Sequence, residues 1–466
     1  MTNRHYSPRS VTIVATELTW IFVSLAAVIS LDLSWQQAGV PIDRVALQLA
    51  VAGVFYVAGF YYADAYNFSD QQLSREVVTN AVRAFSVLAV AFGLIFLCTQ
   101  WLEFHSTTLL LHLMLTTAFV IALRTRIDGV LSRYGVLTRI AIVGTGPEAR
   151  GLAEQMLRKR QYGQEVTCLV SPGGDPGGLE FHSPNPGVRT IPVIAEASLL
   201  PFVKQRRIRR ILVATADLGP ALPVDELLRC KAEGYQVEDG HTFYERLLGR
   251  ISTADLSPQW LIFSDGFARP ASARAVKRVV DVVSAACLLI VTAPLCAVVA
   301  LAIKLEDRGP VLFGQARVGR GGNVFTLWKF RSMRVDAEAE TGPKWAETDD
   351  PRVTRVGRWI RATRIDEIPQ AWNVLEGDMS FVGPRPERPE FVTRLRLEIP
   401  YYDHRHAVRP GITGWAQANF PYGATIEDAR DKLEYDLYYL KNFSVLMDIS
   451  ILFRTVKVIL FGWGSR

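Results

Sequence analysis

The stretch VVSAACLLIVTAPLCAVVALAI, residues 282–303, decides how this chain is organised, because it is uncharged and long enough to enter a membrane. About 20 apolar helical residues cross a bilayer core. A basic pair flanks the stretch at each end: Lys277, Arg278, Lys304 and Arg308. A crossing helix would leave one pair outside, against the positive-inside rule. Pro294, near the middle, would break the helix. We therefore predict a re-entrant helix over about 277–305; a fifth, kinked span is the alternative.

The composition supports a membrane-associated protein of several domains. The chain has 466 residues, of which 49% are hydrophobic, and a net charge of +6. This length predicts two to four folded units, and the hydrophobic fraction favours membrane association. A basic chain suits anionic partners such as lipid headgroups, phosphorylated substrates or nucleic acid. Five cysteines form no CxxC pair, so we interpret them as reduced packing residues of a protein that faces the cytosol.

Four further apolar segments near the N-terminus are each long enough for a membrane helix. They cover 11–31, 45–63, 77–101 and 107–123. Arginines precede the first segment and follow the fourth, so the positive-inside rule places both ends in the cytoplasm. The sequence therefore predicts a four-helix transmembrane bundle over residues 1–130. Buried helices of a soluble protein are the less favoured alternative.

Residues 131–268 alternate between strand and helix patterns and predict a Rossmann-like α/β domain. Gly144 and Gly146 form part of a dinucleotide-binding fingerprint. Ala149 and Arg150 follow where a third glycine would be expected. The next strand, EVTCLVS, lacks the terminal acidic residue that binds a ribose. The sequence leaves two roles open for this domain, nucleotide binding and a structural or regulatory function.

The segment RIDEIPQAWNVLEGDMSFVGPRPE, residues 364–387, carries the candidate chemistry. Thr363 followed by Asp366 resembles a capping box, which would place Asp366 and Glu367 in the first turn of a helix. The helix dipole and nearby arginines would favour both ionised carboxylates. An ionised aspartate can attack phosphorus or bind Mg²⁺, although such a pair alone is more typical of an ordinary helix start. Two prolines hold the backbone around Arg385, which suits phosphate binding.

Five motifs follow one another in a fixed order: KRVVDVV, KLEDRGPVLFGQARVGRGGNVFTLWKFRSMRVDAE, RIDEIPQAWNVLEGDMSFVGPRPE, VRPGITGWAQAN and LEYDLYYLKN. In this order they resemble the bacterial sugar transferase family, the monotopic phosphoglycosyl transferases that start lipid-linked glycan assembly. The resemblance covers about 274–466. It implies a mostly α catalytic domain over 269–466, held on the cytoplasmic leaflet by the re-entrant helix. Many members break that helix at Ser-Pro, whereas this chain has Ala293-Pro294.

The resemblance implies a role for each carboxylate. Asp366 would attack the β-phosphate of a UDP-hexose, releasing UMP and leaving a phosphosugar on the enzyme. Undecaprenyl phosphate would then accept the hexose-1-phosphate, which gives ping-pong kinetics. Glu367 would act as a general base or steer the metal. Mg²⁺, held by Asp366 and Glu367, would neutralise the diphosphate. The longer members favour glucose or galactose, but Asn419-Phe420-Pro421 replaces the family's Asn-Gly-Arg, so the hexose stays open.

Other basic residues support the same site. The resemblance makes Arg385, Lys329 and Arg331 the substrate phosphate-binding residues, although a basic pair at a strand edge is more often only solvated. Five arginines recur at every third position and are interpreted as contacts to lipid headgroups: Arg352, Arg355, Arg358, Arg361 and Arg364. An amphipathic stripe over 444–461 either lies in the membrane interface or covers the core.

Two other functions are alternatives to a phosphoglycosyl transferase. A membrane-bound nucleotide-sugar dehydratase needs a Tyr-x-x-x-Lys pair, and none of the ten lysines has a tyrosine four residues before it. A non-catalytic scaffold of polysaccharide export would tolerate loss of the Asp-Glu pair, which this chain keeps. The prediction is therefore an exopolysaccharide-type phosphoglycosyl transferase in the bacterial inner membrane. Its partners would be UDP-hexose, undecaprenyl phosphate and membrane lipids, with no nucleic acid. The oligomeric state stays open, with a homodimer as one option.

Overall fold

The computed structural model describes residues 15–17, 19–24, 27, 106–133, 138–158, 164–172, 180–181, 191–214, 222–253, 266–267, 270–335, 337, 350–420, 423 and 425–461. The chain divides into two compact units, one over 3–243 and the other over 244–466. We describe each unit by itself. The predicted domain limits at 131 and 269 stay predictions.

The described N-terminal helical residues pack against helix α5 (Ser106–Arg133). Trp20 stacks on Phe119 of α5 with ring centroids 4.2 Å apart, and the Ser24 hydroxyl lies 2.9 Å from Nε2 of His112. These contacts join parts of the first and fourth predicted spans. The predicted spans 45–63 and 77–101 lie outside the described residues, so the four-helix bundle stays a prediction.

The same unit contains the predicted α/β domain. Its strands are β1 (Thr138–Val143), β2 (Gln164–Ser171), β3 (Glu180–Phe181), β4 (Ile191–Ala195), β5 (Arg210–Val213) and β6 (Gln236–Asp239). Its helices are α6 (Pro147–Arg158), η2 (Glu196–Ser198), α7 (Leu199–Arg206) and α8 (Val224–Ala232), with α9 (Gly240–Leu248) following β6. The strand order is β3-β4-β2-β1-β5-β6, and every pairing except that of β3 with β4 is parallel. The Rossmann-like architecture is therefore confirmed, while its role stays open.

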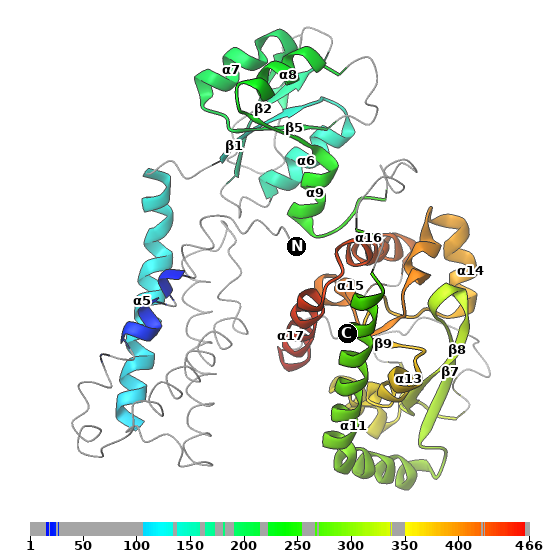
Figure 1. Ribbon diagram of the computed structural model, residues 1–466. Helices are drawn as coiled ribbons and strands as arrows, with labels where there is room; N and C mark the ends of the chain where they lie inside the picture. Colours follow the sequence, from blue (N-terminus) through cyan, green and yellow to red (C-terminus); the bar gives the residue numbers. More distant parts are fainter. Residues whose placement is uncertain are drawn as a thin grey trace. The chain divides into compact units, whose positions relative to one another are not determined.

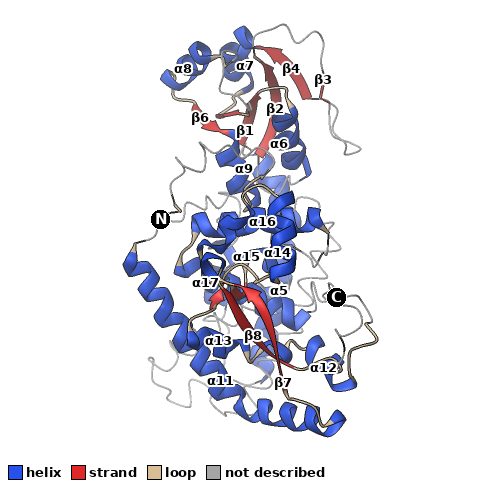
Figure 2. Cartoon of the chain, turned by 90° about the vertical axis from the view of Figure 1, so that its right-hand side faces the viewer, coloured by secondary structure: helices blue, strands red, loops and turns tan. Residues whose placement is uncertain are grey.

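The C-terminal unit is mostly helical, as predicted. Its elements are α11 (Ala271–Asp307), β7 (Leu312–Val318), η3 (Arg320–Gly322), β8 (Val324–Phe330), α12 (Arg355–Ala362), η4 (Ile365–Glu367), α13 (Gln370–Glu376), β9 (Ser380–Val382), α14 (Pro389–Glu398), η5 (Tyr402–Ala407), β10 (Gly411–Thr413), α15 (Trp415–Asn419), α16 (Ile426–Asn442) and α17 (Val445–Phe461). β7 and β8 form a long antiparallel hairpin (Figure 2), and β9 pairs with β10 in parallel.

Helix α11 is the one helix in the described part of the chain that is long and apolar enough to cross a membrane. Only 11% of its most apolar window is buried, which distinguishes it from the core helix of a soluble protein. Ile290 and Val291 just before Pro294, and Val298 just after it, are more than three-fifths exposed. Figure 1 shows the helix changing direction before it reaches β7. An internal proline is the common cause of such a bend.

Both halves of α11 pack against the same unit. Before the proline, Ala285 contacts a cluster formed with Leu327 of β8 and Val374 of α13. After the proline, Val299 and Ile303 pack with residues of β8 and α12. A helix that left the unit to cross a bilayer could not return its second half to this surface. The packing therefore favours the predicted re-entry over a fifth span.

Polar contacts tie both ends of α11 to this unit as well. Arg278 donates to the carbonyls of Val374 and Leu375, 2.5 and 2.9 Å away, at the C-terminal end of α13. Near the other end of α11, Glu306 accepts a hydrogen bond of 2.8 Å from the backbone N–H of Arg355. The predicted basic flank at 277–278 is thus a structural attachment as well as a topological signal.

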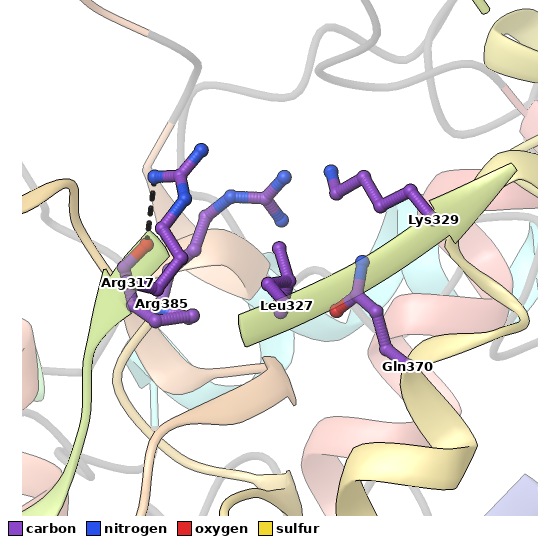
Figure 3. Close-up of a pocket in the computed structure, with 6 residues that line it drawn as sticks. Arg317, Leu327, Lys329, Gln370 and Arg385 are labelled. Atoms are coloured by element: carbon purple, nitrogen blue, oxygen red, sulfur yellow. Dashed lines mark hydrogen bonds between the residues drawn. The ribbon is translucent and has the colours of Figure 1, made fainter. Parts of the chain in front are cut away.

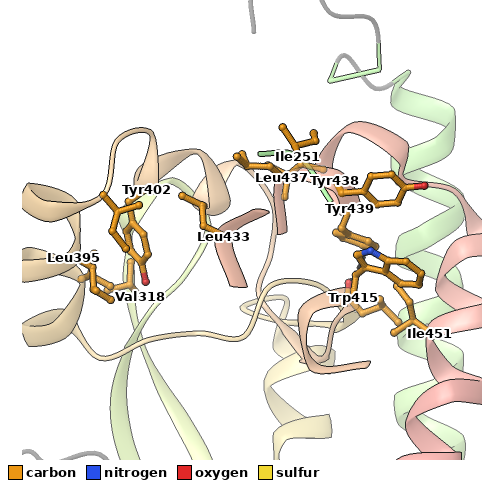
Figure 4. Packing of buried hydrophobic residues seen from close by; sticks show 14 of the residues in the cluster. Ile251, Val318, Leu395, Tyr402, Trp415, Leu433, Leu437, Tyr438, Tyr439 and Ile451 are labelled. Carbon is orange, nitrogen blue, oxygen red and sulfur yellow. Dashed lines mark hydrogen bonds between the residues drawn. The ribbon is translucent and has the colours of Figure 1, made fainter. Parts of the chain in front are cut away.

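The main core lies between α14, α15, α16 and α17 (Figure 4). Helix α17 packs into this core through Met447 and Ile451. Neither residue belongs to the predicted apolar stripe. Four stripe residues are instead exposed: Leu446, Ile449, Phe453 and Val456. The helix therefore has an apolar side toward the core and a second apolar side toward its surroundings. That second side fits the predicted membrane-interface role better than a covering of the core.

Candidate active site

The Asp-Glu pair lies in a short 3-10 turn between two helices, which corrects the predicted capping box. Thr363 ends α12, and its hydroxyl donates to the carbonyl of Trp359 at 2.9 Å. Thr354 caps that helix, since its hydroxyl accepts from Gly357 N at 2.9 Å. Arg364 adopts a left-handed backbone with φ of 59°, which turns the chain sharply before Asp366. Helix α13 begins only at Gln370, so the carboxylates precede it.

Three cations from separate segments surround one oxygen of Glu367. Oε1 lies 2.8 Å from Arg385 Nη2, 3.3 Å from Lys329 Nζ and 3.6 Å from Arg364 Nη1. Lys329 comes from β8 and Arg385 from the Gly-Pro-Arg-Pro turn after β9. Glu367 therefore joins three parts of the unit that are distant in sequence. Two of the predicted phosphate-binding residues, Lys329 and Arg385, are brought together here.

Asp366 has a different environment from its neighbour. Its side chain is only 7% exposed, and among the described residues no hydrogen bond or ion pair reaches its carboxylate. Burial raises the pKa of Asp366, Lys329 opposes that rise and the charge of Glu367 adds to it. The sequence predicted that both carboxylates favour the charged form. For Asp366 the raised pKa instead favours the protonated form. Among the described residues, the site thus holds one carboxylate in direct contact with cations beside one that has no direct partner.

The electrostatic balance at Glu367 is set by its cations. Burial alone would raise the pKa of Glu367, but Arg385, Lys329 and Arg364 lower it well below its usual range. Burial also lowers the pKa of Lys329, while Glu367 raises it. We therefore assign Glu367 as ionised at neutral pH. An acid this strong is a poor proton acceptor.

Asn373 fixes the separation between α13 and β8. Its side chain is fully buried. The amide donates to the Thr326 carbonyl at 2.7 Å and accepts from Trp328 N at 3.0 Å. These are the two backbone groups of β8 that a neighbouring strand would otherwise pair with. Lys329 follows Trp328 directly, so these two hydrogen bonds fix the position of the Lys329 side chain relative to Glu367.

A second support holds Arg385 from behind. The guanidinium of Arg405 donates to the Arg385 carbonyl at 3.0 Å and to Asp436 Oδ2 at 2.8 Å, and both Arg405 and Asp436 are buried. Burial raises the pKa of Asp436 to about 6 although Arg405 lowers it, so this carboxylate is ionised at pH 7. Charge pairing inside the core thus anchors the turn that presents Arg385.

Three glycines allow the backbone of this turn to contact the backbone of residues 409–414. A Cβ on Gly383 would lie 2.4 Å from the Arg409 carbonyl oxygen, and one on Gly411 would lie 2.1 Å from Gly383 N. A Cβ on Gly414 would lie 2.3 Å from the Gly383 oxygen. No larger residue fits at these positions without separating the two segments.

A small pocket opens beside the Glu367 cluster (Figure 3). It is lined by Arg317, Leu327, Lys329, Gln370, Arg385 and Pro386. The sequence predictions missed Arg317, whose guanidinium donates to the Pro386 carbonyl at 3.0 Å. In the hairpin, Arg317 pairs with Phe325 and Gln315 pairs with Leu327. This register places Arg317 on the same sheet face as Lys329, so the hairpin pattern was the signal that could have found it.

Arg331 lies elsewhere. It forms an ion pair with Asp307 at the end of α11 and does not line the pocket. Its predicted contact with substrate phosphate stays a prediction. Within the described residues no group of three His, Cys, Asp or Glu side chains could hold a metal ion.

Comparison with known proteins is consistent with these observations. Residues 272–462 match the family described as bacterial sugar transferase. An N-acetylgalactosamine phosphotransferase acting on undecaprenyl phosphate from Aeromonas hydrophila is 45% identical over 52% of this chain and 56% of its own length. An undecaprenyl-phosphate glucose phosphotransferase from Komagataeibacter xylinus is 35% identical over 68% of this chain and 58% of its own. An exopolysaccharide production protein from Rhizobium leguminosarum is 44% identical over 39% of this chain and 93% of its own.

The exposed apolar helix and the mixed α/β architecture fit a membrane-associated sugar transferase. The chain belongs to the bacterial sugar transferase family. It spans little more than half the length of the Aeromonas and Komagataeibacter relatives.

The buried pair behind Arg385 can be tested by stability. Arg405→Met leaves Asp436 buried without its counter-ion, and we expect a loss of about 3–5 kcal/mol in the free energy of unfolding. The double variant Arg405→Met/Asp436→Leu removes the stranded charge and should recover most of that loss. Thermal unfolding of protein in lipid nanodiscs measures both. A double variant no more stable than Arg405→Met would contradict the ion-pair assignment.

Proposed function

We propose that this protein transfers hexose-1-phosphate from a UDP-hexose to undecaprenyl phosphate, releasing UMP and starting an exopolysaccharide or other lipid-linked glycan. The observation that carries this proposal is the contrast within the Asp-Glu pair. Glu367 is surrounded by cations, whereas the adjacent Asp366 is buried and has no hydrogen bond or ion pair with any described residue. A desolvated carboxylate beside a cation-lined pocket suits nucleophilic attack on a phosphate. The names of the relatives support the same reaction class.

In the first step a carboxylate oxygen of Asp366 attacks the β-phosphorus of the donor. The bond between that phosphorus and the bridging oxygen breaks, and UMP leaves with the oxygen. An aspartyl phosphosugar remains on the enzyme. Lys329 and Arg385 are near enough to receive the charge that develops on the phosphoryl oxygens.

In the second step a phosphate oxygen of undecaprenyl phosphate attacks the same phosphorus. The acyl phosphate bond breaks, Asp366 is regenerated as a carboxylate, and polyprenyl-diphosphate hexose forms. No external oxidant or reductant is needed. Both steps displace one oxygen by another at a single phosphorus, so one set of cations serves both.

Glu367 acts chiefly by holding its cations in place. Its low pKa makes it a weak general base. Through Oε1 it aligns Lys329 and Arg385 toward the pocket before substrate arrives. Without it, three positive side chains would repel one another at this position.

The donor set at the dyad fits Mg²⁺. Asp366 and Oε2 of Glu367 supply carboxylate oxygens that no described contact occupies. Mg²⁺ commonly binds one or two carboxylates together with substrate phosphates. When bound here, the ion would neutralise negative charge on the diphosphate.

The membrane placement follows from α11. Its exposed apolar side chains and its attachment at both ends suit a helix that dips into the cytoplasmic leaflet of the bacterial inner membrane and returns. That position would bring a lipid phosphate and a water-soluble nucleotide to the same site. For the sugar we favour glucose or galactose; the relatives named for glucose and N-acetylgalactosamine make both donors part of any screen.

Replacement of the nucleophile tests the reaction directly. Asp366→Asn should lower UMP release from UDP-hexoses at least about a thousand-fold, because an amide cannot form the covalent intermediate. The assay uses purified protein in nanodiscs with Mg²⁺ and undecaprenyl phosphate. Asp378→Asn, an exposed aspartate just beyond α13, serves as the matched control and should stay within about two-fold of the parent. Persistent turnover in folded Asp366→Asn would remove the nucleophile assignment.

The acid limb of the pH–rate profile should belong to Asp366. The reaction needs the ionised form, and the raised pKa of Asp366 places the limb above the range of an ordinary aspartate. Glu367→Gln removes a negative neighbour that raises this pKa, so the limb should move to lower pH while the rate falls. Glu376→Gln, on the exposed end of α13, should leave the limb where it is. A limb that moves to higher pH in Glu367→Gln would contradict this electrostatic account.

Accessibility of the α11 flanks tests the membrane placement. In a cysteine-free background, Ser272→Cys in the first turn of α11 and Asn323→Cys beyond its end are both exposed positions. A membrane-impermeant maleimide should label both from the cytoplasmic side only. Ile290→Cys, near the bend, should resist labelling because lipid covers it. Labelling of the two flanks from opposite sides would establish a crossing helix and exclude re-entry.

A further inference from the structure

Gln370 is the one uncharged polar residue among the six that line the pocket. Its side chain is only 2% exposed, and its amide nitrogen Nε2 has no hydrogen-bond partner within the described residues. A buried donor left unpaired destabilises a protein, and such groups are rare in native structures. The position therefore calls for an acceptor that arrives with a ligand.

The location of Gln370 relates it to the reacting groups. It is the first residue of α13 and follows Asp366 by four positions. Figure 3 shows its amide nitrogen directed toward the side of the pocket where Lys329 projects from β8. Lys329 and Arg385 both contact Glu367. The unpaired amide donor is therefore part of the same cluster as the catalytic pair.

The chemistry of the lining selects the ligand. Arg317, Lys329 and Arg385 offer only donors and carry three positive charges, and Gln370 adds a neutral N–H. One carboxylate, Glu367, offsets part of this charge. A ligand with several anionic acceptor oxygens around one atom satisfies such a set, and a phosphoryl group has that form.

We propose that Gln370 donates its Nε2 hydrogen to a non-bridging oxygen of the phosphoryl group that passes through Asp366. The proposal rests on the function proposed above and adds a substrate-contacting residue to it. Lys329 and Arg385 have flexible side chains and turn from Glu367 onto the same phosphoryl group. Gln370, fixed at the start of α13, holds that non-bridging oxygen to the side of the line of attack, so that the bridging oxygen to UMP lies opposite Asp366.

The test compares Gln370→Met and Gln370→Glu with the parent in nanodiscs. Methionine keeps the volume of the side chain and removes the donor, so kcat/KM for UMP release should fall about 10- to 100-fold. Glutamate places a carboxylate against the phosphoryl oxygens and should lower kcat/KM further. The melting temperature of the methionine variant without ligand should equal or exceed that of the parent, because an unpaired buried donor has been removed. A structural role would lower it.

A ligand-binding measurement separates this proposal from the proposed function. UDP should raise the melting temperature of the parent, and the rise should shrink in both Gln370 variants. Gln417→Met alters a glutamine of the same unit that does not line the pocket, and it should leave the UDP response unchanged. If the parent releases UMP and both Gln370 variants keep kcat/KM within two-fold, the inference about Gln370 fails and the proposed function stands. If the parent releases no UMP, the proposed function fails, and the UDP response alone decides whether Gln370 contacts phosphate.

Discussion

The contact of Glu367 with Lys329, Arg385 and Arg364 is the interaction on which the candidate site depends. One carboxylate oxygen meets cations from a strand, a turn and its own helical segment. Opposite charges in a buried site interact strongly, and removing one partner leaves the others uncompensated. The arrangement is stable only when β8, the 365–367 turn and the Gly-Pro-Arg-Pro turn are all in place. Folding of the unit and assembly of the site are therefore the same event.

The surrounding structure supplies the rigidity that this cluster needs. Asn373 holds α13 to β8 with two hydrogen bonds, and Arg278 of α11 holds the other end of α13. Arg405 does the same for the Arg385 turn. The apolar helix α11 is consequently joined to the helix that follows the Asp-Glu pair, so the apolar helix and the candidate site share one framework.

The sequence was sufficient for the α/β domain, the long apolar helix and part of the candidate site, while the four-helix bundle stays a prediction. The uncharged stretch around Pro294, the alternation over 131–268 and the Asp-Glu pair each carried a local signal. Lys329 and Arg385, which were predicted to bind phosphate, both contact Glu367. Arg317 was missed because its position depends on the register of a hairpin, which is a non-local property.

Other differences have equally physical causes. Thr363 looked like a cap, but Thr354 nine residues earlier begins the helix and Thr363 ends it. The apolar stripe of α17 was ambiguous because both of its sides are apolar, so periodicity could not say which side is buried. Among the described residues, Glu367 contacts three cations directly and Asp366 contacts none, a difference that arises from the tertiary fold and is not visible in two adjacent letters.

The direct backbone contact among Gly383, Gly411 and Gly414 limits how the site can adapt. Two main-chain segments that touch without intervening side chains have nothing between them to compress or rearrange. If the proposed reaction uses different donors, accommodation of them would come from rotation of long side chains rather than from movement of the turn beneath them. In the proposed reaction, recognition of the sugar ring, which lies beyond the phosphate, would fall to residues outside these contacting segments.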